Sequence, residues 1–270
     1  MQVFKSTGNI IAPLIVSLFV VNMVDWRPFA FGSFSILLAF LAFLILIFVI
    51  SRGNIIENKP SEQIKQRNVL IEFHLWEKLG KLLRPILIIA FYYNMIDAFF
   101  WTLIPIYAES SNFQQFGGLF LAAYSLPALI TGWFIGSITE KFGKKKTAYA
   151  SLFTGPLILL SFFFIKNPVV LVISVFLASC FIKMTHPVIN SSIADYVSDA
   201  PLMEMEIESL EDFALNIGYI FGPISAGVLA DLFGIQNAFG ILGLIGAVLA
   251  ALLLIFGPKH IIINPKPSEL

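Results

Sequence analysis

The feature of this sequence that most constrains its fold is a series of long apolar segments that contain almost no charge. Eight such segments can be marked along the 270 residues, at 6–24, 29–50, 86–107, 115–138, 148–165, 169–189, 213–230 and 237–256. Of the 34 charged side chains, 17 basic and 17 acidic, only Asp97 and Lys183 lie within them. Runs of about 18 or more such residues are typical of helices that cross a lipid bilayer. The sequence therefore predicts an all-α, polytopic membrane protein with eight transmembrane helices.

Composition and motifs argue against several other classes of protein. Hydrophobic residues make up 58% of the chain and charged residues only 13%, too little charge for a water-soluble enzyme. Cys180 is the only cysteine, which excludes a disulfide scaffold. The sequence has no phosphate-binding loop, HExxH motif or paired cysteines. We therefore expect that the protein is not an enzyme and that it has no catalytic residue, metal site or cofactor. Because the net charge is zero, we expect no nucleic-acid partner.

The distribution of basic residues predicts the orientation of the chain in the membrane. If the N-terminus lies inside, the inner segments hold 14 of the 17 basic residues, and the outer loops hold only Arg27 and Lys166. Short cytoplasmic loops collect lysine and arginine. We therefore predict a multi-pass protein of the cell membrane with both termini in the cytoplasm.

The connection after the fourth apolar segment has a distinctive spacing of glycine, acidic and basic residues. It reads Gly136-Ser-Ile-Thr-Glu140-Lys141-Phe-Gly143-Lys144-Lys145-Lys146. This connection resembles the loop motif of the major facilitator superfamily, which joins the second and third helices of each six-helix half. The resemblance implies that the loop latches the two halves together on the cytoplasmic side in one conformation. The gating role would fall on Gly136, Glu140, Lys141, Gly143, Lys144 and Lys145.

Each specified residue of this connection has an expected structural role. We expect Gly136 to permit a close helix approach and Gly143 to permit a tight turn. Glu140 could pair with a basic side chain or cap a helix. The alternative is a simple turn whose lysines only keep the loop inside.

The acidic segment 195–212, which contains no basic residue, is expected to be a solvated inner loop. The alternative is that it forms a salt link to the lysines at 141–146.

An internal repeat predicts how the helices are organised. Gly8-x-x-x-Ala12-Pro13 in the first segment matches Gly218-x-x-x-Gly222-Pro223 in the seventh, and Phe29 and Phe239 share the same offset. The last six segments then form one complete six-helix unit. The first two segments correspond to the last two helices of a preceding unit. By resemblance, the chain covers helices five to twelve of a twelve-helix member, and four more helices would precede Met1.

The predicted domains follow from this repeat. Residues 1–51 would be the last two helices of an N-terminal bundle, 52–85 a cytoplasmic linker, 86–257 a C-terminal six-helix bundle and 258–270 a cytoplasmic tail. Within the linker, apolar residues recur every three or four positions from Val69 to Leu83. This pattern predicts an amphipathic helix lying in the headgroup plane with its apolar side toward the acyl chains.

The glycine and proline elements permit two interpretations. They resemble a family motif in the fifth helix of a six-helix half that is associated with drug antiporters, and they also suit a small-residue packing face with a proline kink. The residues concerned are Gly8, Pro13, Gly218, Gly222, Pro223 and Gly227.

Ionisable residues inside apolar segments are candidates for function because burying them is unfavourable. Asp97 lies near the middle of 86–107 and shares a helical face with Asn94 and Trp101. A carboxylate there could bind and release a proton, or it could fix helix contacts through hydrogen bonds. Lys183 and His186 could bind an anionic substrate or pair with Asp97. Lys183 could instead extend to the inner surface.

Together these features predict a secondary active transporter of a small solute, with a rocking mechanism, coupling to H+ and a resemblance to drug efflux antiporters. Its partners would be the lipid bilayer, a small-molecule substrate and the four preceding helices. An importer of metabolites or sugars is the alternative within the family. A membrane fragment that does not transport without a partner or further helices is the alternative from another class.

Overall fold

The computed structural model describes residues 27–52, 69–109 and 117–256 of the chain. The helices, in order, are α2 (Arg27–Arg52), α3 (Val69–Glu109), α4 (Gly117–Ser125), α5 (Pro127–Phe142), α6 (Lys144–Leu159), η2 (Leu160–Phe163), α7 (Pro168–Asp199), η3 (Pro201–Met203), α8 (Glu204–Phe233) and α9 (Ile235–Phe256). These ranges contain helices and no β-strand, which confirms the all-α prediction.

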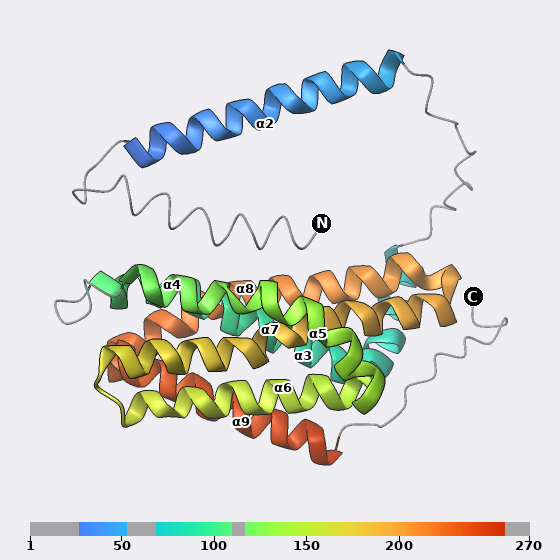
Figure 1. The fold of residues 1–270 in the computed structure, drawn as a ribbon. Helices are drawn as coiled ribbons and strands as arrows, with labels where there is room; N and C mark the ends of the chain where they lie inside the picture. The colour runs from blue at the N-terminus through green and yellow to red at the C-terminus, as the bar shows by residue number, and fades with distance from the viewer. Residues whose placement is uncertain (1–26, 53–68, 110–116, 257–270) are drawn as a thin grey trace.

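The helices from α3 to α9 pack side by side in one bundle, and α2 lies apart from it (Figure 1). The described side chains of α2 are mostly exposed, including Phe34, Ile36 and Ile45 at 57%, 72% and 64%. A helix that is apolar all round requires an apolar environment on all sides. The composition of α2 therefore agrees with a helix that is surrounded by lipid or by other apolar helices.

Five helical stretches in the described part of the chain are long and apolar enough to cross a bilayer. They are Trp76–Tyr107, Leu119–Phe142, Pro168–Asp199, Glu204–Phe233 and Ile235–Phe256. The first predicted segment lies outside the described residues, and α6 has only 16 residues before it continues into η2. The structure therefore supports a multi-pass membrane protein, and the count of eight crossings stays a prediction.

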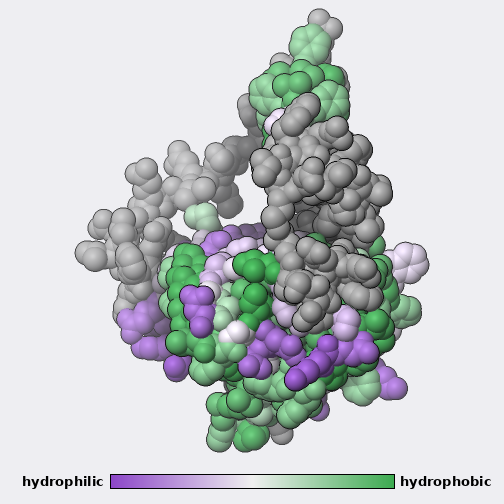
Figure 2. Space-filling view, turned by 90° about the vertical axis from the view of Figure 1, so that its left-hand side faces the viewer, coloured by the Kyte–Doolittle hydropathy of each residue, from purple (hydrophilic) through white to green (hydrophobic). Residues whose placement is uncertain are grey.

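Polar residues are found at the end of the bundle where α7 and α9 begin. Figure 2 shows this end, with hydrophilic side chains between hydrophobic ones. Its exposed polar residues include Lys166, Asn167, Asp231 and Asn237. Asn167 caps α7, because its side-chain oxygen accepts hydrogen bonds from the backbone N–H groups of Val169 and Val170.

Single glycines join two pairs of neighbouring helices. Gly143 lies between α5 and α6, and Gly234 lies between α8 and α9, with φ of +84° and +81°. Residues with a side chain rarely adopt this backbone conformation. The N–H of Gly143 donates to the carbonyl of Thr139, and the N–H of Gly234 donates to the carbonyl of Ala230, both at 2.9 Å. The predicted tight turn at Gly143 is confirmed.

The structure differs from the prediction of a separate amphipathic helix in the headgroup plane. Residues 69–85 form the beginning of α3, which continues without a break into the bundle. Leu79 and Leu83 are buried, and the Trp76 ring lies 5.7 Å from the ring of Phe213 on α8. The apolar side therefore faces another helix. An apolar stripe has the same pattern whether lipid or protein covers it, so the sequence could not separate the two cases.

Helices α3 and α8 approach each other closely along the small-residue face. A Cβ atom on Gly222 would lie 2.6 Å from the Cβ of Ala98 and 2.8 Å from the carbonyl oxygen of Met95. A Cβ on Gly218 would overlap the carbonyl oxygen of Phe91. These two glycines therefore form a packing face, as one of the two interpretations predicted.

The rest of the glycine and proline element behaves differently. Gly227 has open space where a Cβ would lie, and Pro223 is exposed. Neither residue therefore takes part in the close approach of α3 and α8. Gly8 and Pro13 lie outside the described residues.

We expect the substitution Gly222→Ala to destabilise the protein and Gly227→Ala to leave it unchanged or slightly more stable. Alanine favours a helix more than glycine does, but at position 222 its methyl group would press into α3, at a cost of about 1–3 kcal/mol. Unfolding of the purified protein in mixed micelles with increasing SDS measures the difference. Equal stability of the two variants would contradict the packing role of Gly222.

Candidate functional site

The two charged residues of the apolar segments lie together in the structure. Asp97 on α3 and Lys183 on α7 form an ion pair, with their side chains only 14% and 11% exposed. An isolated charge is very unfavourable in a low-dielectric interior, and an opposite charge beside it offsets much of this cost. Of the alternatives for Lys183, the structure shows pairing with Asp97 and not extension to the surface.

Tyrosine side chains surround this ion pair. The hydroxyl of Tyr124 on α4 donates to Oδ1 of Asp97 at 2.7 Å, and the hydroxyl of Tyr219 on α8 donates to Oδ2 at 3.4 Å. The ammonium group of Lys183 lies 4.2 Å from the ring centroid of Tyr124 and 5.9 Å from that of Tyr93. We call these five residues the Asp97 cluster. Four helices, α3, α4, α7 and α8, contribute to it.

The other predicted transport residues lie around the cluster at different distances. The ring of Trp101 packs edge-on against Tyr124, with centroids 6.3 Å apart, and the ring of His186 lies 5.3 Å from that of Tyr93. Asn94 has a different role. Its side-chain amide donates to the carbonyl of Leu215 at 3.0 Å, so it links α3 to α8.

The Asp97 cluster reaches the surface of the bundle along α8. Tyr219 is 48% exposed, and its neighbours Ile220 and Phe221 are also exposed. The ion pair lies behind this tyrosine. A solute approaching from the face of α8 would therefore meet the hydroxyl of Tyr219 before it met the charges.

Sequence reasoning did not assign roles to Tyr124 and Tyr219. The chain has seven tyrosines and 28 phenylalanines, so an aromatic residue in an apolar segment is usually phenylalanine. A tyrosine hydroxyl in such a segment needs a hydrogen-bond partner. The few tyrosines near the middle of the apolar segments could therefore have been predicted to form hydrogen bonds with Asp97.

The loop motif forms the junction of α5 and α6, next to the end of α7. The ammonium group of Lys144 lies 2.6 Å from Oδ2 of Asp195 and donates to the carbonyl of Ser191 at 3.1 Å. This pair is the salt link that was the alternative expectation for the acidic segment. The expected loop at 195–212 is wrong, because α7 continues to Asp199 and α8 begins at Glu204. Hydropathy marked only the apolar part of each helix, and both helices extend beyond it.

Of the remaining motif residues, Gly136, Glu140 and Lys141 are exposed in the described part of the chain. A Cβ on Gly136 would meet no atom within 4 Å there, so the expected close approach of another helix is absent from these residues. Glu140 and Lys141 lie exposed in the last turn of α5, and no ion pair of Glu140 is present among the described residues. Lys141 lies 5.4 Å from the ring centroid of Phe142.

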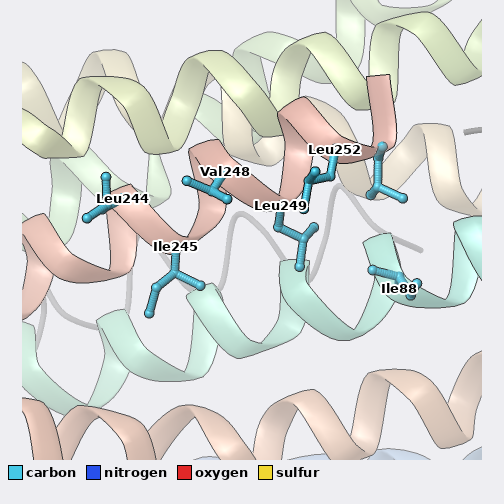
Figure 3. A pocket seen from close by; sticks show the side chains of 7 residues that line it. Ile88, Leu244, Ile245, Val248, Leu249 and Leu252 are labelled. Atoms are coloured by element: carbon cyan, nitrogen blue, oxygen red, sulfur yellow. The ribbon is translucent and has the colours of Figure 1, made fainter. Parts of the chain in front are cut away.

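A separate apolar groove lies between α3 and α9. Figure 3 shows the side chains that line it, and its volume is about 530 Å³. They are Ile88, Leu244, Ile245, Val248, Leu249, Leu252 and Leu253. These aliphatic side chains offer no hydrogen bond to a polar solute. The groove therefore suits a hydrocarbon chain better than a transported polar molecule.

Helices of membrane-spanning length that enclose an ion pair among tyrosines define a polytopic membrane protein with an internal polar site. The sequence matches the family model of the Major Facilitator Superfamily over residues 1–202 and, in a second match, over residues 117–270. The chain therefore belongs to the Major Facilitator Superfamily.

One relative with a known sequence adds to this assignment. An uncharacterized MFS-type transporter of Methanocaldococcus jannaschii is 24% identical over 170 residues, which are 62% of this chain and 43% of that protein. The matched part of the chain therefore spans less than half the length of this relative.

We expect Asp97→Asn and Lys183→Met to destabilise the protein individually by about 3–5 kcal/mol, because each leaves a buried charge without its partner. The double variant should recover most of this loss. Unfolding in SDS mixed micelles measures all three variants. Glu77→Gln and Lys81→Met provide the control, because this ion pair is 64% and 74% exposed and should contribute about 0–1 kcal/mol. Additive losses at positions 97 and 183 would show that the pair is not coupled.

Proposed function

We propose that the protein acts as a secondary active transporter of a small solute, with the Asp97 cluster as its central site. The observation that supports this most strongly is the sequestered ion pair, since structural packing alone has no need of two charges among membrane-spanning helices. In transporters of this kind, two six-helix halves rock against each other around a site near the middle of the bilayer. The exposure of Tyr219 places one edge of the cluster on the bundle surface, where a second half could face it.

We further propose that a proton on Asp97 couples transport to the H+ gradient. Protonation would remove the negative charge from the carboxyl group and release the ammonium group of Lys183. The freed Lys183 could then bind an anionic group of the solute, with Tyr124 and Tyr93 as aromatic neighbours. The packing of Gly218 and Gly222 against α3 explains these glycines without an antiporter mechanism. The proposal therefore leaves open whether the solute is imported or exported.

The loop motif is proposed to act as the cytoplasmic gate. Lys144 already joins α6 to α7 through Asp195, and Glu140 and Lys141 are exposed beside it. The space around Gly136 is open in the described residues, so a helix of another half could pack there. These features support a loop with one side fixed to its own bundle and the other side free to meet a partner.

The proposed arrangement in the membrane has residues 86–257 as one six-helix bundle and residues 1–51 in a second half, with both termini in the cytoplasm. Two overlapping matches to one family model are what an internal repeat would produce. The location of α2 outside the bundle of α3 to α9 also supports this division.

Labelling of single cysteines tests the orientation. In a Cys180→Ser background, cysteines at positions 144 and 199 should both react with a membrane-impermeant maleimide only from the cytoplasmic side. The structure brings these positions to the same end of the bundle, where Lys144 and Asp199 line one cavity. A cysteine at position 166 should react from the outside, and labelling of 144 and 199 from opposite sides would contradict the arrangement.

Transport is tested with the purified chain in liposomes that contain the pH indicator pyranine. A panel of carboxylates, sugars, amino acids and cationic dyes is added in turn, and we expect one class to drive proton movement. Asp97→Asn should abolish this movement because its side chain cannot take up the proton. Asp231→Asn, at the exposed end of α8, is the control and should behave like wild type.

Two outcomes would contradict different parts of the proposal. Undiminished proton movement in Asp97→Asn would remove this residue from coupling. If wild type moves none of the solutes while remaining folded in the liposomes, this chain does not transport by itself. The alternative of a membrane protein that requires a partner would then be favoured.

A further inference from the structure

A polar cavity lies at the basic end of the bundle, away from the Asp97 cluster. Its volume is about 800 Å³, and it is bounded by the first turn of α6, the last turns of α7 and the end of α9. Three consecutive lysines, Lys144, Lys145 and Lys146, line it together with Tyr149 and Tyr196. The cavity therefore combines positive charge with hydroxyl groups.

The first turn of α6 opens into this cavity. Gly143 precedes the helix and provides no side-chain cap, and the residues from Gly143 to Lys146 all line the cavity. The first N–H groups of a helix have no acceptor within the helix, and the helix dipole makes this end positive. An anion in the cavity could accept hydrogen bonds from these N–H groups.

The charges around the cavity leave a positive excess. Lys144 is neutralised by Asp195, which leaves Lys145 and Lys146 with Asp199 as the one other carboxylate among the described residues that line the cavity. Lys145 lies 5.8 Å from the ring centroid of Tyr196, and burial lowers its pKa. A bound anion would supply the charge that this partly buried ammonium group lacks.

The side chain of Tyr196 provides an independent indication of a ligand. The residue is only 3% exposed, and its hydroxyl group has no hydrogen-bond partner among the described residues. A buried hydroxyl without a partner is unfavourable. Since Tyr196 lines the cavity, a ligand with an acceptor oxygen would satisfy it.

The rim of the cavity is apolar. Phe142, Leu254 and Ile255 line it and are 58%, 44% and 72% exposed. A site for a soluble phosphate has no need of an exposed apolar rim, whereas a phospholipid could place its acyl chains against it. Basic pockets between helices at the cytoplasmic side of membrane proteins are suited to anionic headgroups.

We propose that this cavity binds the phosphate group of an anionic phospholipid from the cytoplasmic leaflet. The first N–H groups of α6, the ammonium groups of Lys145 and Lys146 and the hydroxyl of Tyr196 hold the phosphate. The acyl chains lie along the end of α9. The bound lipid joins the ends of α6, α7 and α9 beside the Lys144–Asp195 pair, and the site is independent of the transported solute.

Titration of the purified full chain with dioleoyl phosphatidylglycerol in detergent, followed by native mass spectrometry, tests the site. We expect the first molecule of this lipid to bind more tightly than dioleoyl phosphatidylcholine. Lys145→Gln and Lys146→Gln should each weaken it about five-fold, the contribution expected of one basic residue at an anionic lipid surface. Lys166→Gln, which removes an exposed lysine at the other end of the bundle, is the matched control and should bind like wild type.

Two further variants separate a local effect from misfolding. Tyr196→Phe should weaken binding because it removes only the hydroxyl group. Asp199→Asn should strengthen binding because it removes the competing carboxylate, and a misfolded protein would not gain affinity.

Equal affinity for the two lipids, or no change in the lysine variants, would overturn the proposal. If inorganic phosphate instead stabilises wild type against heat, and the lysine variants lose this effect without any preference for the anionic lipid, the site takes a soluble phosphate.

Discussion

The ion pair between Asp97 and Lys183 is the interaction that places the strongest constraint on the bundle. Either charge alone among apolar helices is unfavourable, so the pair restrains the distance and the relative rotation of α3 and α7. The close approach of α8 at Gly218 brings the next residue, Tyr219, to the same carboxylate. Packing by small residues on α8 and the ion pair between α3 and α7 therefore meet at the same side chain, Asp97.

Two ion pairs that connect helices, Lys144 with Asp195 and Asp97 with Lys183, differ in what can break them. Lys144 and Asp195 are 33% and 58% exposed, so water and salt compete with their attraction. Asp97 and Lys183 are largely shielded from water, and only a proton or a charged ligand can separate them at moderate cost. A bundle with one loosely held end and a tightly held middle can open at that end without losing its central site.

The sequence was sufficient to find the apolar helices of the described residues and the two central charges, because an apolar segment makes any charge within it conspicuous. It was not sufficient to identify the partners. Which helix covers Trp76 and Leu83, or which hydroxyl meets Asp97, depends on how helices are rotated about their axes, and periodicity alone does not give rotation. The same limit explains Asn94, which shares a helical face with Asp97 in the sequence pattern but bonds to α8.

The two single-glycine turns show which parts of the loop motif the backbone requires. Glu140-Lys-Phe-Gly143 and Asp231-Leu-Phe-Gly234 both end a helix with an acid, a phenylalanine and a glycine of nearly the same φ. Three lysines follow Gly143, whereas Ile235, Gln236 and Asn237 follow Gly234 at the other end. The turn therefore needs the glycine and not the lysines. The lysines must serve another purpose, and two of them already have a contact in the structure, Lys144 with Asp195 and Lys145 with the ring of Tyr196.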